Sequence, residues 1–258
     1  MIDEEVFPAG AAIVVGGSGG LGAASARALA RAGSDIALCY RTGKASAERL
    51  ASELGELGRR VTIHVMDVTD SASIETALEQ AIAGHGRVHT AVWAAGPLVE
   101  QHYLSQIPLD QLQKALEIEV QGFFRVSQAI LPHFRASGGG SFVHLGSAGD
   151  LIWASRDGLS VVPKAANEAM IRGLAREEGR YNIRANSILV GVIDAGMFHE
   201  LSARGHFSER WVEETQRMLA LKRWGTPEEI GHAVVFLASS RAGYTTGQQI
   251  AVAGGLGV

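Results

Sequence analysis

Short apolar runs rich in β-branched residues alternate along the chain with longer stretches whose apolar positions recur at helical spacing. The short runs predict strands, and the stretches between them predict amphipathic helices. This βαβ alternation predicts an α/β fold of the Rossmann-like, doubly wound type, with helices on both faces of a parallel sheet. The expected strands are 11–17, 36–41, 61–68, 88–96, 141–147, 183–193 and 248–254, and the expected helices are 23–32, 46–57, 73–84, 109–137 and about 163–179.

The alternation runs from one end of the chain to the other. No linker, low-complexity segment or internal repeat divides it, so we predict a single domain over residues 1–258. Only residues 198–225 depart from the pattern. That segment mixes charges, aromatic residues and a helical stretch between two sheet elements, which is typical of a lid over a substrate site. The alternative interpretation is a pair of surface helices.

Composition narrows the class of partner. The chain has 258 residues with 23 Lys plus Arg against 27 Asp plus Glu, and its formal net charge of -4 offers no basic field for nucleic acid or an anionic membrane. We therefore expect a small-molecule partner. The single cysteine, Cys39, permits no disulfide within the chain and favours the cytoplasm as a reducing compartment. The acidic opening MIDEEVFPAG is unlike a secretion signal, and no apolar run approaches the ~18 residues of a membrane span.

A glycine-rich loop directly follows the first expected strand. In VVGGSGGLGAASARALA, Gly16, Gly20 and Gly22 have the spacing GxxxGxG, with Ser18 and Leu21 between them. Glycine lets the chain turn sharply and lets backbone N–H groups approach a pyrophosphate, while the helix that follows directs its positive N-terminal end at the same anion. Strand, loop and helix together predict a dinucleotide site.

The end of the second expected strand indicates which dinucleotide binds. An NAD site typically carries an acidic residue there for the ribose hydroxyls, whereas this chain has LCYRTGK, with Arg41 and Lys44. The positive charge favours a 2′-phosphate and thus NADP, with NAD as the alternative. Arg41 is otherwise a solvated charge at a strand end. Asp67, followed by Val68 in MDVTD, ends the third strand and either accepts a hydrogen bond from an adenine amine or caps the next helix.

Further motifs extend over nearly the whole chain: GGSGGLG, DVTD, GRVHTAVWAAG, GSFVHLGSAG, the lysine of PKAANEAM, IRANSILVGVIDAGM and RWGTPEEIGHAVVFLASSRAGYTTGQQIAVAGG. In this order they resemble the short-chain dehydrogenase/reductase family. The resemblance implies hydride transfer with a nicotinamide dinucleotide. It also implies a homo-oligomer, a dimer or tetramer, that pairs through the helices around 109–137 and 163–179.

The resemblance implies roles for single residues as well. In the family a tyrosine transfers a proton, and a lysine four positions later binds the ribose and lowers the pKa of that tyrosine. A serine polarises the substrate oxygen, and an asparagine holds a water that relays protons. Lys164 matches the lysine and Ser147 matches the serine. The remaining matches are cofactor positions: Ala94 and Gly96 in WAAG, and Gly191, Val192 and Ile193 in the loop that contacts the nicotinamide carboxamide.

The departures from the family pattern lie where its chemistry occurs. Ser160 stands at the tyrosine position, Glu119 at the asparagine position and Trp93 at the first asparagine of the NNAG motif. The chain thus resembles a divergent member that lacks the active-site tyrosine, and a serine hydroxyl is a far weaker acid than a phenol. Glu119 either replaces the water relay or forms an ion pair that fixes Lys164. If the helix begins at Pro163, which suits a first helical turn, Ser160 and Lys164 are not stacked one turn apart.

Several residues are candidates for the missing proton donor. Asp157 stands seven positions before Lys164, where enoyl reductases of this superfamily place their tyrosine. A carboxyl in an apolar pocket can stay protonated near neutral pH. Asp150 closely follows Ser147 in the same loop, and His102 and Tyr103 lie in a loop that borders the substrate cleft in the family. Each of these is otherwise a solvated loop residue, and we assign no metal ligand.

These observations support an NADP(H)-dependent oxidoreductase that transfers a hydride between nicotinamide and a small carbonyl or conjugated enoyl substrate, with an atypical proton donor. One alternative is an enoyl or dienoyl thioester reductase, in which the proton goes to carbon and Ser147 and Lys164 stabilise an enolate. Another is a dinucleotide-binding sensor or subunit with impaired catalysis. A hydrolase that uses Ser147 and His144 is disfavoured, because residues three apart on one strand point to opposite faces.

Overall fold

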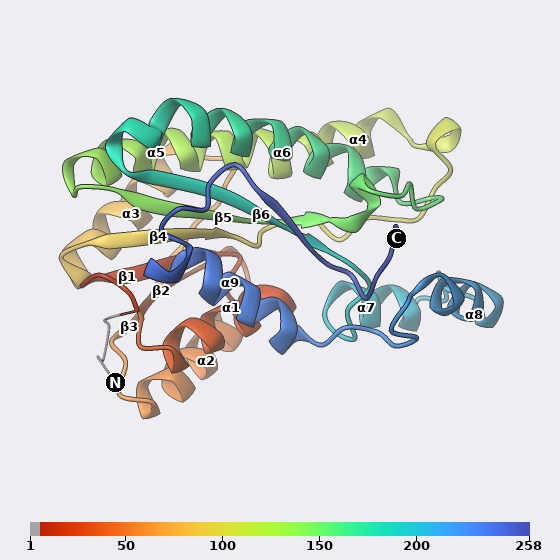
Figure 1. The fold of residues 1–258 in the computed structure, drawn as a ribbon, viewed down its shortest axis with the longest axis horizontal. Helices are drawn as coiled ribbons and strands as arrows, with labels where there is room; N and C mark the ends of the chain where they lie inside the picture. The colour runs from red at the N-terminus through yellow and green to blue at the C-terminus, as the bar shows by residue number, and fades with distance from the viewer. Residues whose placement is uncertain (1–5) are drawn as a thin grey trace.

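The computed structural model describes residues 6–258 and is organised around a seven-stranded sheet in which all paired strands are parallel (Figure 1). The strand order is β3-β2-β1-β4-β5-β6-β7. This sheet confirms the predicted Rossmann-like fold in a single domain. The acidic residues that open the sequence lie outside the described residues. The strands are β1 Ala11–Val15, β2 Asp35–Tyr40, β3 Val61–Val65, β4 Val88–Trp93, β5 Gly140–Ser147, β6 Ile183–Val190 and β7 Gln249–Val252.

Helices cover both faces of the sheet (Figure 1). All five residues of β1 are buried; Ile13 and Val15 pack into one layer, and Ala12 and Val14 pack into the other. A strand buried on both faces is apolar throughout, which explains why the strands were predictable. One layer contains α3 Ser71–His85, α4 Leu109–Leu116, α5 Gly122–Ala136 and α6 Gly158–Glu178, and the other contains α1 Gly20–Arg31, α2 Lys44–Glu56 and α9 Pro227–Ala238. Within residues 6–258 no helix is both long and apolar enough to cross a membrane.

Two helices differ from the predicted bounds. The expected helix 109–137 contains a π-turn, Glu117–Gln121, between α4 and α5. The expectation that Pro163 opens the next helix was wrong, because α6 begins at Gly158 and continues through this proline. The helix can begin early because the Asp157 carbonyl oxygen accepts hydrogen bonds from the backbone N–H groups of Ser160 and Val161. The proline costs α6 one internal hydrogen bond without ending it.

The carboxyl ends of the parallel strands meet at one edge of the sheet. Chain order reverses between β1 and β4, since β1 pairs with β2 on one side and with β4 on the other. In open α/β sheets such a reversal leaves a crevice beyond the strand ends, where ligands bind. The loops that follow β1 to β6 converge at this edge, and they contain the residues singled out in the sequence.

The segment 198–225 forms most of two helices, α7 Met197–Ala203 and α8 Glu209–Met218, which lie beyond the strand ends and apart from both helix layers (Figure 1). Its aromatic rings pack on one another, with centroids 4.1 Å apart for Phe207 and Trp211 and 5.5 Å apart for Phe198 and Trp224. The segment therefore contains a cluster of packed aromatic rings. Its action as a lid stays a prediction.

Candidate active site

The loop after β1 has the shape of a phosphate cradle. Gly16 has a φ of +82°, and a Cβ at this position would lie 2.8 Å from the Ala94 carbonyl oxygen. Gly22, in the first turn of α1, lies so close to the Gly16 carbonyl oxygen that a Cβ would overlap it. The helix is capped by Gly19, which has no side chain to occupy the first N–H groups. This helix start can therefore receive an anion.

A cation stands beside the cradle, at the end of β2. Arg41 is exposed, and its guanidinium forms no hydrogen bond or ion pair with another residue in the range 6–258. Ser18 lies next to the same turn, since a Cβ on Gly43 would approach its Oγ to 2.8 Å. The residues that end β2 and follow it, CYRTGK, contain no carboxylate. The charge of Arg41 is thus free to bind a phosphate.

The loop after β3 corrects one interpretation of Asp67. Its Oδ1 accepts hydrogen bonds from the Thr69 backbone N at 2.9 Å and from the Thr69 Oγ1 at 2.7 Å. These bonds, with a smaller contribution from nearby Arg41, hold the pKa of Asp67 below its ordinary value. Asp70 caps α3, because its side chain accepts from the Ala72 N at 3.0 Å. The capping interpretation of Asp67 was therefore wrong.

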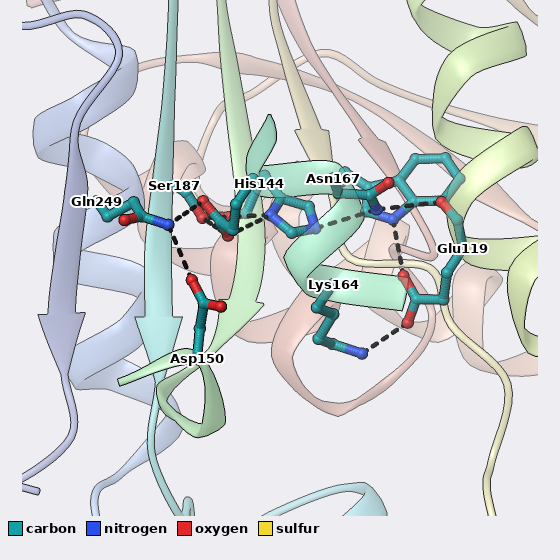
Figure 2. Close-up of polar contacts among 9 residues, drawn as sticks. Glu119, His144, Asp150, Lys164, Asn167, Ser187 and Gln249 are labelled. Atoms are coloured by element: carbon teal, nitrogen blue, oxygen red, sulfur yellow. Dashed lines mark hydrogen bonds and ion pairs between the residues drawn. The ribbon is translucent and has the colours of Figure 1, made fainter. Parts of the chain in front are cut away.

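Two of the three departures from the family pattern contact each other. Glu119 is buried in the π-turn with 2% of its surface exposed, and its Oε1 accepts a hydrogen bond from Lys164 Nζ at 2.6 Å (Figure 2). Its Oε2 accepts a second bond from Trp93 Nε1 at 3.2 Å. Gly96 leaves room for the Glu119 carboxylate, since a Cβ at this position would overlap Glu119 Oε1. The ion-pair alternative for Glu119 is therefore confirmed, and Trp93 completes the pairing of the buried carboxylate.

Asp157 lies at the start of the helix that carries the lysine. It is the N-cap of α6, with Ser160 in the first turn and Lys164 one turn later. Its Oδ1 accepts from Gln101 Nε2 at 3.0 Å. Burial raises the pKa of Asp157 above the ordinary carboxyl value, although Gln101, Lys164 and Ser160 act in the opposite direction. Acid, hydroxyl and cation therefore lie close together, which the expected helix start at Pro163 did not allow.

The side chains of the other candidate donors contact other partners than Lys164. The Asp150 Oδ2 accepts from Gln249 Nε2 at 3.2 Å, and His102 is hydrogen bonded to a neighbouring glutamate. Tyr103 is 57% exposed, and its ring lies 5.9 Å from the Arg156 guanidinium carbon. His102 also forms an isolated β-bridge with Asp157, so the backbone of its loop lies beside the start of α6.

The serine predicted to polarise the substrate and the predicted nicotinamide loop lie at the ends of β5 and β6. Ser147 ends β5, and its Oγ accepts from the Gly149 N at 3.1 Å, which leaves the hydroxyl proton free to donate. After β6, the Val192 carbonyl oxygen accepts from the Gly225 N at 3.0 Å, and Ile193 forms a β-bridge to Gly225. The predicted nicotinamide loop is thus joined to the last residue of the predicted lid.

The predicted cofactor positions therefore gather at one edge of the sheet, in loops that follow β1, β2, β3, β4 and β6. They are Gly16, Ser18, Gly20, Leu21, Gly22, Arg41, Asp67, Val68, Ala94, Gly96, Val192 and Ile193.

Sequence reasoning missed a buried polar cluster behind this edge (Figure 2). His144 Nδ1 lies 3.0 Å from Glu168 Oε1, and its Nε2 lies 3.3 Å from Asn167 Nδ2. The Ser187 hydroxyl also donates to Glu168, and Gln249 Nε2 donates to Glu168 Oε2 at 2.9 Å. The available signal was a histidine and a serine inside otherwise apolar strands. Because both ring nitrogens of His144 have partners in this cluster, no nucleophile–base pair forms with the serine that ends β5.

Comparison with known proteins places this geometry in a family. Residues 15–257 match the family model described as enoyl-(acyl carrier protein) reductase. Oxidoreductase UcpA from Salmonella typhimurium is 30% identical over 247 residues, which cover 95% of this chain and 93% of that protein. A blue fluorescent protein from a metagenomic library, solved in complex with NADPH, is 34% identical with a TM-score of 0.85 and covers 96% of this chain and 98% of its own.

A short-chain type dehydrogenase/reductase from Mycobacterium ulcerans superposes with a TM-score of 0.90 at 26% identity, over 97% of this chain and 90% of its own. The similarity extends over the cradle, the sheet and the helix that carries Lys164. The chain therefore belongs to the short-chain dehydrogenase/reductase family.

Proposed function

We propose that this protein is an NADP(H)-dependent oxidoreductase that transfers a hydride between nicotinamide and a small carbonyl or conjugated enoyl substrate. The glycine loop fits a pyrophosphate, because Gly16 and Gly22 let the backbone pack closely into a tight turn whose N–H groups, with those at the start of α1, can bind an anion. Unpaired Arg41 beside Ser18 fits a 2′-phosphate. The related blue fluorescent protein was solved with NADPH, which supports this preference. NAD is the alternative cofactor.

One observation carries the proposal: Asp157 caps the helix that carries Ser160 in its first turn and Lys164 one turn later, and burial raises the pKa of this carboxyl. When bound, the nicotinamide dinucleotide supplies or accepts the hydride. In the reductive direction, protonated Asp157 gives its proton to the substrate oxygen, directly or through the Ser160 hydroxyl, and the carboxylate that remains is stabilised by the charge of Lys164. Ser147 donates a hydrogen bond to the same oxygen as negative charge develops on it.

The variant Asp157→Asn tests the proton donor, because a carboxamide keeps the shape and loses the acid. Purified protein is first screened with NADPH against ketones, quinones, imines and enoyl thioesters. With a substrate found in this way, we expect kcat/KM of the variant to fall by about 100-fold or more. The wild-type rate of reduction should decline as pH rises through the raised pKa of Asp157, since the acid is then lost, and the variant should lack this decline.

Asp150→Asn is the matched comparison, because Asp150 is the competing carboxyl. We expect it to retain wild-type kcat/KM within about twofold, since its carboxylate contacts Gln249. Full activity of Asp157→Asn with an unchanged pH profile would exclude Asp157 as the donor. Loss of activity in Asp150→Asn alone would transfer the role to Asp150.

An enoyl or dienoyl thioester as substrate is supported by the description of the matching family model. Reduction of a conjugated double bond places the proton on carbon, so the oxygen needs hydrogen bonds more than a strong acid. Ser147 and Lys164 can provide these bonds. Activity on enoyl thioesters that exceeds activity on every ketone tested would favour this substrate class.

A second candidate function is a dinucleotide-binding sensor or subunit with impaired catalysis. The observation that favours it is the ion pair of 2.6 Å between Lys164 Nζ and Glu119 Oε1. A lysine whose charge is already paired with a carboxylate stabilises the charged form of a nearby proton donor less than an unpaired lysine does. Lys164→Ala separates the two functions. An enzyme should lose its rate of turnover sharply, whereas a sensor should lose only affinity for NADPH.

Four further proposals concern the cofactor, the lid, the oligomeric state and the location of the protein. Arg41→Ala should weaken binding of NADPH but not NADH, which titration of both measures. We propose that residues 198–225 close over the substrate, and that the chain is a homo-oligomer, dimer or tetramer, which pairs through α4, α5 and α6; sedimentation gives its mass. We also propose a cytoplasmic location, which fractionation of the source cells tests.

A further inference from the structure

The buried cluster around His144 lies between β5, β6 and α6, directly behind the active-site lysine (Figure 2). Its core side chains are almost fully enclosed, with exposures of 0% for His144, Asn167 and Ser187 and 1% for Glu168. Gly146 leaves room for the Glu168 carboxylate, because the Cβ of any other residue at this position would overlap Glu168 Oε1. An enclosed carboxylate and imidazole reduce stability unless every group is paired. A cluster of this kind therefore suggests a role other than stability.

Hydrogen bonding determines the protonation of the cluster. Asn167 Nδ2 lies 3.1 Å from the Glu119 carbonyl oxygen and 3.3 Å from His144 Nε2, and an amide nitrogen has two hydrogens to donate. His144 Nε2 therefore accepts, and the ring proton is on Nδ1, 3.0 Å from Glu168 Oε1. Burial raises the pKa of Glu168, but hydrogen bonds from His144 and two further donors bring it below the ordinary value, so the group is a carboxylate. One tautomer and one amide orientation result, and the buried Asn167 Oδ1 is left without a hydrogen-bond partner among residues 6–258.

Helix α6 thus holds the π-turn at two points. Asn167 binds the backbone oxygen of Glu119, and Lys164 binds its carboxylate. Lys164 and Asn167 are three residues apart and lie on one face of α6. We propose that Asn167, held by the His144–Glu168 pair, is a positioning residue that sets Glu119 and thereby the Lys164 ammonium for the nicotinamide ribose. This rests on the proposed cofactor role of Lys164.

The test compares two ligands in the variant Asn167→Leu. NADPH contains the nicotinamide ribose that Lys164 is proposed to bind, whereas adenosine 2′,5′-bisphosphate contains only the adenosine half. Calorimetric titration measures both affinities, and the fluorescence of bound NADPH reports the surroundings of the nicotinamide. We expect NADPH to bind about tenfold more weakly to the variant, because a small displacement of a positioned group weakens its contacts. The affinity for the bisphosphate should change by less than about twofold.

Asn186→Leu is the matched control. Asn186 is also 0% exposed, but its side chain donates to the Thr245 carbonyl oxygen at 2.8 Å and accepts from the Gln248 N at 3.0 Å, at the opposite side of β6 from the lysine. Loss of this amide removes a buried polar group without touching the π-turn. We expect its ratio of NADPH to bisphosphate affinity to equal that of the wild type, even if its Tm falls.

His144→Leu gives an independent measurement, and Asn167→Ser serves if the leucine variant does not fold. Each variant should reproduce the selective loss of NADPH affinity. His144→Leu removes the ring that holds the Asn167 amide, and in Asn167→Ser the serine side chain is too short to reach both the Glu119 carbonyl oxygen and His144. An equal loss for both ligands, no loss for either, or the same selective loss in Asn186→Leu would overturn the proposal. If wild-type protein binds the bisphosphate but shows no added affinity for NADPH or NADH, the cofactor role of Lys164 fails, and the positioning role fails with it.

Discussion

Replacing Lys164 by Met should destabilise the protein chiefly through the carboxylate that it leaves behind. The Glu119 side chain is 3% exposed, and in Lys164→Met only the Trp93 indole N–H still pairs with it. Removal of one partner from a buried ion pair costs about 3 kcal/mol. In a chain of this size each kcal/mol lowers Tm by about 2–4 °C, so we expect a fall of about 6–12 °C. Glu119→Gln should cost less, because the Lys164 side chain is 16% exposed and can turn toward water.

The double variant tests the pairing itself. Glu119→Gln with Lys164→Met removes both charges and should be more stable than the sum of the single losses predicts, by about 2 kcal/mol. Urea unfolding followed by circular dichroism measures all four proteins, without dinucleotide because bound ligand would add stability of its own. The control pair is Glu200 and Arg204, 2.8 Å apart but about half exposed, with an expected coupling below about 0.5 kcal/mol. A coupling at Glu119 and Lys164 no larger than this control would refute the buried ion pair.

Three further outcomes are expected. Gly16→Ala should abolish NADPH binding, because its Cβ would lie 2.8 Å from the Ala94 carbonyl oxygen at a φ of +82°; retention of wild-type affinity in a titration would contradict this. Burial raises the pKa of the Cys39 thiol, so a disulfide thiol reagent should modify it only in urea, and rapid modification of the native protein would be inconsistent with its position in the core. Hydrogen bonds from Arg223, and from a backbone N–H, lower the pKa of Glu229 to about 2, so its stabilisation is present above the ordinary carboxyl pKa and is lost as pH falls toward 2. Thermal unfolding should therefore show Glu229→Gln less stable than wild type at neutral pH and equally stable in acid, whereas a pH-independent difference would point to a role for shape alone.

Features of the fold that depend on residues close together in the sequence could be predicted from the sequence alone. Burial on both faces makes a strand such as β1 apolar throughout, and a glycine loop between strand and helix marks a phosphate cradle. Helix starts were less predictable. Pro163 indicated the start of α6, but hydrogen bonds to the Asp157 carbonyl begin the helix earlier. The sequence allowed Asp67 to cap the next helix, but the structure places Asp70 at that position, where its side chain accepts from the Ala72 N.

The sequence by itself predicted an altered centre, since Ser160, Glu119 and Trp93 stand where the resemblance to the family implies other residues. Only the tertiary structure decided how these changes fit together. Lys164 and Glu119 are 45 positions apart, and Trp93 and Glu119 are 26 apart. Such contacts depend on how β4 and the π-turn pack against α6, and on the space that Gly96 leaves for a carboxylate. Periodicity records which face of an element is buried, but it does not record which side chains of different elements meet there.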